Sequence, residues 1–346
     1  MAGKTMEVIV HIGAHKTGTT SIQDFLFSRR DELLNRENIL YPTSRSIGFK
    51  QNHTDLTAGV FHNHDDLGRM VVSRIKSSGA ERDVYYGTYV EELRSEIEAS
   101  SCDKVVLSTE AFFRHANDFD WHKLSRDIGI PLEFFRFVVY LRDPAHHYLS
   151  LVQQRIKYSS RFKSPKSVPF RKVVQSYEDK FPGRVSIRIL ELVSDSVADI
   201  KSVIGIKAYD EFDNPVERKN ESLSAEAMQL IQLYRQRFMS DLDNVVDAKG
   251  RRLLQVVMNA DANLVGGIKP KLFQNVYDSI NLGVFDDISW LESQCEVDIP
   301  WKISQRMNKI DTGGISLISD ICFVDKDRLS MLNLHVFDNL LAGQVG

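Results

Sequence analysis

The segment from Val8 to Ser21 constrains the fold of this chain more than any other part of its sequence. An apolar run ends in a turn that contains Gly13, and Lys16, Gly18 and several hydroxyl side chains follow before a helical pattern begins. This order predicts a strand, a loop and a helix. The N–H groups of the loop, the positive end of the helix dipole and the Lys16 ammonium all attract anions. The segment therefore predicts a site for a phosphate or sulfate group.

Short apolar runs elsewhere in the chain predict a sheet around this loop. They lie at residues 7–12, 37–41, 104–108, 134–141 and 184–190. Several are apolar on both faces, as are strands of a parallel sheet that helices cover. Helical patterns alternate with them, which favours a P-loop-like α/β fold with a parallel sheet of about five strands. The connection over residues 42–82 is long, so we expect it to contain small helices or to serve a function.

A change of composition near Pro215 predicts the organisation of the chain. We expect residues 1–214 to form the α/β core, and residues 215–346 to form a mainly helical extension that packs on it as part of the same domain. Ser224 is placed to cap the first helix of this extension. The spacing predicts that this helix buries Leu230, Ile231, Tyr234 and Phe238.

Composition and charge exclude several classes of protein. The formal net charge of -3 disfavours a nucleic-acid-binding surface, so any attraction for anions is local. Cys102, Cys295 and Cys322 are too scattered for a disulfide framework or a zinc site. No secretory leader pattern opens the chain, and no apolar run approaches the roughly 20 residues that span a bilayer. We expect a soluble, cytoplasmic protein without a metal; its oligomeric state stays open.

The first loop differs from a Walker A motif, in which the lysine follows the last glycine. Here Lys16 precedes Gly18, which lets the backbone approach an anion closely. The neighbouring threonines supply hydroxyl donors. The alternative is an ordinary strand-to-helix turn with a threonine cap.

A second basic position follows the fourth predicted strand. Arg142 is followed directly by Asp143 and Pro144, with Ser150 eight residues beyond the arginine. Open α/β sheets bind ligands at the carboxyl ends of their strands, and a guanidinium suits a phosphate. The alternative is a surface ion pair between Arg142 and Asp143.

Together the two segments resemble the PAPS-dependent sulfotransferases. The sequence around them resembles the bacterial carbohydrate-type branch of that family. PAPS, 3′-phosphoadenosine 5′-phosphosulfate, is the sulfuryl donor of that family. The segment Lys16 to Thr20 matches its 5′-phosphosulfate loop, and Arg142 to Pro144 with Ser150 matches its 3′-phosphate motif. The resemblance covers residues 7–210. It implies that PAPS is bound by His15, Lys16, Thr17, Gly18, Thr19, Thr20, Ser21, Arg142 and Ser150.

Some positions depart from the cytosolic small-molecule branch of that family. His15 stands where those members have proline, and Ser21 stands where they have tryptophan. Their late Arg-Lys-Gly-x-x-Gly segment has no counterpart, since Arg218 and Lys219 lack the glycines. The acceptor class is therefore not carried over from that branch.

Two residues are candidates for the general base. Glu110 follows the third predicted strand, and several carbohydrate sulfotransferases use a glutamate; alternatively, Glu110 only begins the next helix. His53, in the long connection, is the second candidate. The group His62, His64, Asp65 and Asp66 matches no metal signature. His146 and His147 are expected to be exposed on a helix.

The resemblance implies a sulfotransferase that moves a sulfuryl group from PAPS to a hydroxyl or amine of a carbohydrate or glycoconjugate. The reaction is an in-line displacement that releases PAP, with Lys16 on the developing charge and no metal required. One alternative is a P-loop nucleotide kinase or NTPase, with Asp143 in the place of a Walker B carboxylate. Another is a non-catalytic nucleotide-binding module.

Overall fold

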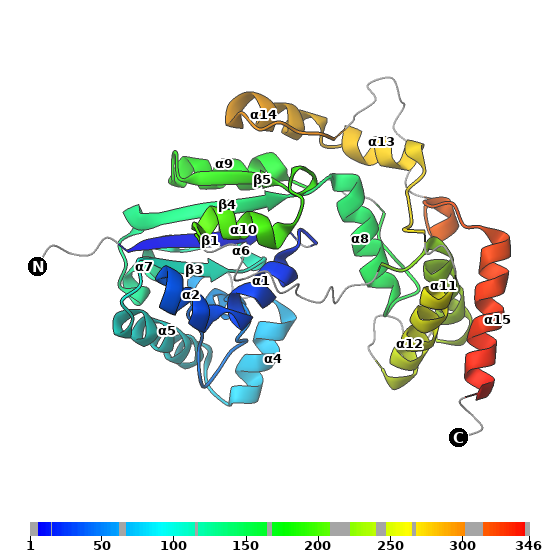
Figure 1. The fold of residues 1–346 in the computed structure, drawn as a ribbon, viewed down its shortest axis with the longest axis horizontal. Helices are drawn as coiled ribbons and strands as arrows, with labels where there is room; N and C mark the ends of the chain where they lie inside the picture. Colours follow the sequence, from blue (N-terminus) through cyan, green and yellow to red (C-terminus); the bar gives the residue numbers. More distant parts are fainter. Residues whose placement is uncertain are drawn as a thin grey trace, which may run out of the picture. The chain divides into compact units, whose positions relative to one another are not determined.

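The structure is a computed structural model that describes residues 6–14, 16–61, 67–114, 117–164, 168–207, 222–239, 247–264, 268–301 and 314–342. The chain divides into two compact units (Figure 1). Unit 1 comprises Met1–Arg142, Pro169–Glu217 and Asp287–Pro300, and unit 2 comprises Asp143–Val168, Arg218–Asp286 and Trp301–Gly346. The units therefore interleave along the sequence, which differs from the single boundary expected between residues 214 and 215.

Unit 1 contains a five-stranded parallel sheet with the order β2-β3-β1-β4-β5, which confirms the expected fold class. The strands are β1 (Glu7–Gly13), β2 (Ile39–Leu40), β3 (Lys104–Ser108), β4 (Phe135–Leu141) and β5 (Val185–Ile189). The strands β2 and β3 lie on one side of β1, and β4 and β5, which follow them in the chain, lie on the other side. In sheets of this type, ligands bind at the carboxyl end of the strand where the order reverses, which is β1 here.

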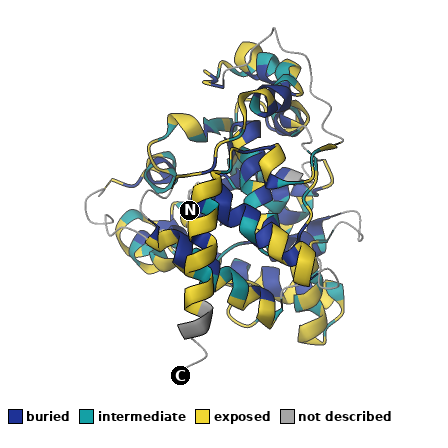
Figure 2. Cartoon of the chain, turned by 90° about the vertical axis from the view of Figure 1, so that its right-hand side faces the viewer, coloured by how far each residue is buried: buried dark blue, intermediate teal, exposed yellow. Residues whose placement is uncertain are grey.

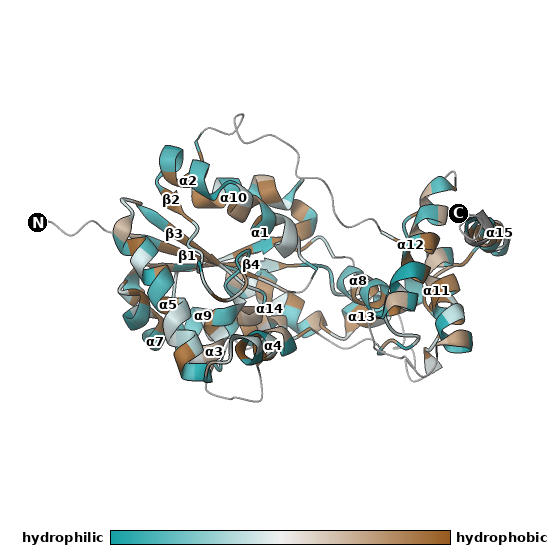
Figure 3. Ribbon diagram, turned by 90° about the horizontal axis from the view of Figure 1, so that it is seen from below, coloured by the Kyte–Doolittle hydropathy of each residue, from teal (hydrophilic) through white to brown (hydrophobic). Residues whose placement is uncertain are grey.

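Helices cover both faces of the sheet (Figure 3). On one face lie α1 (Thr19–Ser28), α2 (Arg30–Glu37) and α10 (Ser196–Ile204); on the other lie α5 (Arg82–Ala99), α7 (Trp121–Ile128) and α9 (Phe170–Lys180). The shorter helices before β5 are η1 (Thr54–Leu56), α3 (Thr57–Val60), α4 (Arg69–Ser78), α6 (Ala111–Arg114) and η3 (Leu132–Phe134). Two further helices are η4 (Leu190–Leu192) and α14 (Phe285–Cys295).

Strand β4 explains why the strands are apolar on both faces. Val138 and Tyr140 pack in the cluster that contains the apolar side chains of α1 and α10. Phe135 and Phe137 point to the opposite face, where both pack edge-on against Trp121 and Phe137 also stacks on Phe181. Because successive side chains of a strand alternate between faces, a strand covered on both sides needs apolar residues throughout.

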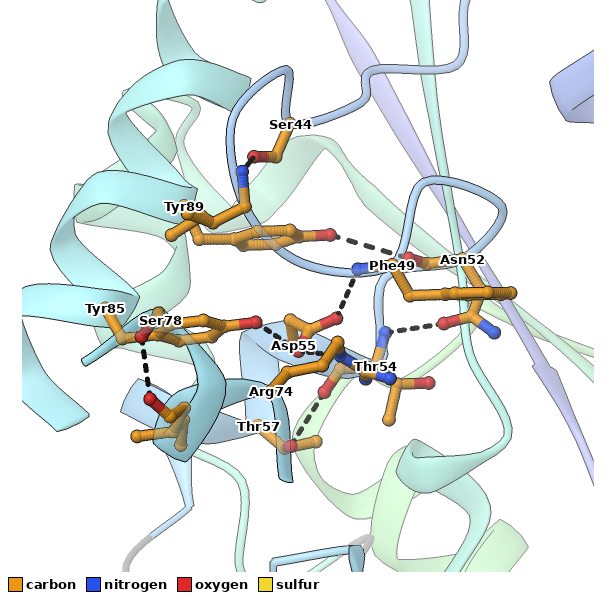
Figure 4. A network of polar contacts seen from close by, with 12 residues as sticks. Ser44, Phe49, Asn52, Thr54, Asp55, Thr57, Arg74, Ser78, Tyr85 and Tyr89 are labelled. Atoms are coloured by element: carbon orange, nitrogen blue, oxygen red, sulfur yellow. Dashed lines mark hydrogen bonds and ion pairs between the residues drawn. The ribbon is translucent and has the colours of Figure 1, made fainter. Parts of the chain in front are cut away.

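The long connection between β2 and α5 contains η1, α3 and α4, which confirms the expected small helices. It is organised around Asp55, whose side chain is fully buried (Figure 4). This carboxylate accepts hydrogen bonds from the backbone N–H of Phe49 (2.9 Å), Nε of Arg74 (2.8 Å) and the hydroxyl of Tyr85 (2.8 Å). One buried charge therefore ties the connection to α4 and α5.

Unit 2 is built from α8 (Pro144–Ile156), α11 (Ala225–Phe238), α12 (Ala248–Asn263), α13 (Gln274–Leu282), η8 (Ile318–Asp320) and α15 (Lys326–Ala342). Residues of α8, α11, α12, α13 and α15 share one apolar core, which explains why α8 groups with the later helices. Ser224 caps α11 as expected, with Oγ accepting from the N–H of Ala227 (3.1 Å). The helix α15 exposes most of its described residues, which are yellow in Figure 2.

The expected buried face of α11 is partly wrong. Ile231 is buried, but Tyr234 is 38% exposed and Phe238 is 67% exposed. Polar residues occupy the buried face instead: Gln232 donates to the carbonyls of Ser160 and Ser316, and Arg235 donates to that of Lys157. The apolar pattern alone misplaced this face because these polar side chains are buried with hydrogen-bond partners.

Replacing Asp55 by alanine is expected to destabilise unit 1 by about 3–5 kcal/mol, because Arg74 and Tyr85 lose a buried charged partner. Tyr85→Phe removes one of the three hydrogen bonds and is expected to cost about 1 kcal/mol. Urea unfolding of both variants measures the difference. A loss below 1 kcal/mol for Asp55→Ala would contradict the central role of this carboxylate.

Candidate functional site

The loop between β1 and α1 has an unusual backbone. Lys16 and Gly18 both adopt the left-handed conformation, with φ values of 70° and 81°. Thr17, between them, is buried and donates from Oγ1 to the carbonyl of Ala14 (2.7 Å). A left-handed lysine costs about 1–2 kcal/mol, and such strain tends to cluster at functional sites. The backbone therefore turns sharply between β1 and α1; His15 lies outside the described residues.

Close packing on the loop explains its glycines. A Cβ on Gly18 would lie 2.7 Å from Oγ and 2.9 Å from Cβ of Ser196, the first residue of α10. A Cβ on Gly13 would lie 2.5 Å from Oγ1 of Thr17. Both glycines are therefore required by space, and Gly18 is also required by its φ angle.

The N-termini of α1 and α10 are capped differently. Asp195 caps α10 by accepting from the N–H groups of Val197 and Ala198. The cap residue of α1 is Gly18, which has no side chain to accept from the first N–H groups of that helix. Since these N–H groups have no partner within the helix, they suit an external anion.

The hydroxyls near the start of α1 have different surroundings. Thr19 is buried, and its Oγ1 has no hydrogen-bond partner among the described residues. Thr20 and Ser21 are exposed. Thr19 is therefore the best placed of the three to donate to a group held by the loop, because a buried hydroxyl without a partner is costly.

Arg142 lies beside the loop at the end of β4. Its Nη1 donates to the carbonyl of Lys16 (2.7 Å), and its Nε lies 4.0 Å from Oε1 of Glu191. The guanidinium thus supports the left-handed residue and brings a second cation to the cradle. Ser150, the expected partner of Arg142, lies on α8 in unit 2 and is half-buried.

Asp143 does not have the role that a Walker B carboxylate needs. It is buried and caps α8 by accepting from the N–H groups of Ala145 (2.8 Å) and His146 (3.1 Å). The hydroxyl of Tyr277 donates to its second oxygen. The contacts of Asp143 are those of a helix cap, as Pro144 at the first helical position predicts. His146 is exposed as expected, whereas His147 is half-buried.

Glu110 lies at the carboxyl edge of the sheet, two residues beyond the end of β3 and directly before α6. It is half-buried. The residue before it is held tightly: Thr109 donates its N–H to the carbonyl of His11 (3.2 Å), and its Oγ1 is 2.9 Å from Oγ1 of Thr54. Glu110 therefore directly precedes α6, and the hydrogen bonds of Thr109 hold this part of the chain next to β1.

His53, the second candidate base, has a structural role instead. It is buried, its Nε2 lies 2.8 Å from the carbonyl oxygen of Pro42, and its Nδ1 accepts from the N–H of Ser108 (3.0 Å). Burial lowers the pKa of His53 to about 4, although both backbone hydrogen bonds oppose this shift. With both ring nitrogens engaged and a low pKa, His53 is unsuited to remove a proton from an acceptor.

A buried polar network below the loop was missed from the sequence. Asn52 donates to Oε1 of Gln23 (3.4 Å), and Nε2 of Gln23 donates to Oγ of Ser108 (3.1 Å). That hydroxyl lies 2.8 Å from Nδ1 of His11, which is fully buried. A histidine within the apolar run of β1 was the signal that could have revealed the network.

Other parts of the described chain offer weaker sites. A groove lies at the amino ends of the strands, lined in part by Glu7, Arg136 and Arg184. Glu7 pairs there with Arg136 (2.7 Å), and sheets of this type bind ligands at the opposite edge. The described residues contain no group of three or more potential metal ligands and no helix suited to crossing a membrane. The group at His62–Asp66 lies outside the described residues.

No protein-family model matches the chain, and no curated protein matches it.

Gly18→Ala is expected to destabilise the protein by more than about 1–2 kcal/mol, which is the cost of the left-handed backbone alone. Gly79→Ala is the matched control, because Gly79 has a similar φ of 70° but its Cβ would meet nothing within 4 Å. Urea unfolding measures both. Equal losses would show that the contact with Ser196 does not constrain the loop.

Proposed function

We propose that this chain is a PAPS-dependent sulfotransferase. The observation that carries the proposal is the strained loop at the carboxyl end of β1, where Lys16, the uncapped start of α1 and Arg142 meet. Two cations and a set of N–H groups suit a donor that carries several negative groups. The order of the two motifs along the chain supports PAPS as the ligand over one that carries a single phosphate.

The residues present fit the sulfonated end of such a donor. The first N–H groups of α1 and the Thr19 hydroxyl would hold its oxygens, since Gly18 offers those N–H groups no side chain and Thr19 Oγ1 has no hydrogen-bond partner among the described residues. Lys16 would stabilise the charge that grows on the bridging oxygen between sulfur and phosphorus, usually the largest contribution to catalysis. Arg142, which lies in the same unit as the loop, would bind the 3′-phosphate, as the resemblance implies.

The proposed reaction is a single displacement at sulfur. The acceptor hydroxyl gives its proton to the Glu110 carboxylate while its oxygen forms a bond to sulfur. The bond from sulfur to the bridging oxygen breaks, and its electron pair leaves with PAP. No metal is required to bridge phosphates. The acceptor class, a carbohydrate or glycoconjugate, and a cytoplasmic location rest on the resemblance and the sequence alone.

Two alternatives predict different ligands. A P-loop kinase or NTPase would require ATP with Mg²⁺, but the position of Lys16 and the capping role of Asp143 disfavour it. A non-catalytic module would bind PAP and transfer nothing. Binding of PAP or of ATP with Mg²⁺ distinguishes a sulfotransferase from a kinase. Turnover distinguishes a sulfotransferase from the non-catalytic module.

PAP without Mg²⁺ is expected to raise the unfolding temperature of the protein, by an amount equivalent to about 2.7 kcal/mol at a hundred times its Kd. Lys16→Ala and Lys16→Gly are each expected to weaken PAP about 10- to 100-fold, because both remove a charged hydrogen-bond donor. Lys16→Gly also relieves the left-handed strain, so it should be no less stable than Lys16→Ala. Stabilisation by ATP with Mg²⁺, but not by PAP, would favour a kinase.

Glu110→Gln is expected to lower kcat by about 10²–10⁴-fold and to leave PAP binding unchanged, because the amide keeps the shape of the side chain but cannot take the proton. Transfer from labelled PAPS to a panel of sugars and alcohols measures this. Unchanged kcat would remove Glu110 from the mechanism. PAP binding without transfer to any acceptor by the wild-type protein would favour the non-catalytic module.

A further inference from the structure

His11 has one ring nitrogen that the fold leaves unused. The side chain is fully buried, and Nε2 has no hydrogen-bond partner among the residues that the structure describes. A buried polar atom without a partner is costly, and such atoms are rare in folded proteins. Ile9, on the same face of β1, packs in an apolar cluster, so a polar side chain at position 11 is a departure from its surroundings.

The other side of the ring is held firmly. Nδ1 lies 2.8 Å from Oγ of Ser108, and the ring packs edge-on against Tyr140 with centroids 5.2 Å apart. Gln23 already donates to the same oxygen of Ser108 (3.1 Å). Ser108 therefore keeps its own hydrogen to give to Nδ1 or to Tyr41, which is also within its reach. If Nδ1 receives that hydrogen, the ring proton resides on Nε2.

Glu110 is the charged group that acts on this ring. Its charge raises the pKa of His11 against the larger effect of burial, which lowers that pKa to about 4. The backbone places the two residues together: the carbonyl of His11 accepts from the N–H of Thr109, the residue before Glu110. A neutral imidazole is thus fixed beside the segment that carries the proposed base.

We propose that His11 is a positioning residue for Glu110, with Nε2–H donating to the Glu110 carboxylate when substrates are bound. Hydrogen bonds of this kind are often long or unmade in a free enzyme and tighten in the loaded complex. A neutral donor suits the role, because it aligns the carboxylate without neutralising it. The inference rests on the proposed function, in which Glu110 removes the proton of the acceptor.

Two substitutions of His11 separate its two ring nitrogens. Asparagine can retain the contact that Nδ1 makes with Ser108 and lacks a group at Nε2, whereas glutamine can place a donor near Nε2 and loses the contact with Ser108. His11→Asn is expected to lower kcat by about tenfold or more, less than the loss of the base itself, with KM for PAPS unchanged. His11→Gln is expected to retain more of kcat although it is less stable.

A purely structural His11 would give the opposite order. His11→Asn would then be stable and fully active, and His11→Gln would lose stability and activity together. That result would overturn the proposal. The equivalent pair at His53, where both nitrogens are engaged, is the matched control: both variants should lose stability without a selective effect on kcat.

Nitrogen resonances of the His11 ring test the contact without measuring turnover. The wild-type spectrum is expected to show the proton on Nε2, and Glu110→Gln is expected to shift Nε2 more than Nδ1. The opposite tautomer, or an Nε2 that does not respond to Glu110→Gln with or without PAP, would overturn the proposal. Failure of PAP to stabilise the protein would instead count against the proposed function, so the two failures are distinguishable.

Discussion

The hydrogen bond from Arg142 to the carbonyl of Lys16 is the interaction on which the proposed site depends. It joins the end of β4 to the loop that follows β1, and it supports a lysine in a backbone conformation that favours glycine. With the close contact between Gly18 and Ser196, it leaves the loop little freedom. A cradle held in shape before its ligand arrives loses less entropy on binding.

The topology of the sheet brings the other parts of the site to the same edge. Strand β1 lies between β3 and β4, so the residues after all three strands, Lys16, Glu110 and Arg142, share the carboxyl edge. The long connection contributes support: His53 and Thr54 attach it to the end of β3, and Asp55 attaches it to α4 and α5. These polar contacts are buried, which makes each of them costly to break.

The sequence predictions were correct where the signal is local and wrong where distant contacts decide the role of a residue. The five strands and the cap at Ser224 were predicted well, because two-sided apolar runs and cap residues act within a few residues of the chain. Tyr234 and Phe238 were misplaced because buried polar side chains, Gln232 and Arg235, take the inner face of α11. His53 looked like a base because its two backbone partners, 11 and 55 residues away, are invisible in the sequence.

By itself, the sequence determined that a strand, a loop and a helix follow one another over residues 7–28, and that they belong to an α/β fold with a parallel sheet. These features depend on residue type and short spacing, which the chain carries directly. Only the tertiary structure decided that Lys16 is left-handed, that Arg142 supports it and that Asp143 is a cap. It also decided that Nε2 of His11 has no hydrogen-bond partner among the described residues. Contacts such as that of Arg142 join residues more than a hundred positions apart, and only packing brings such residues together.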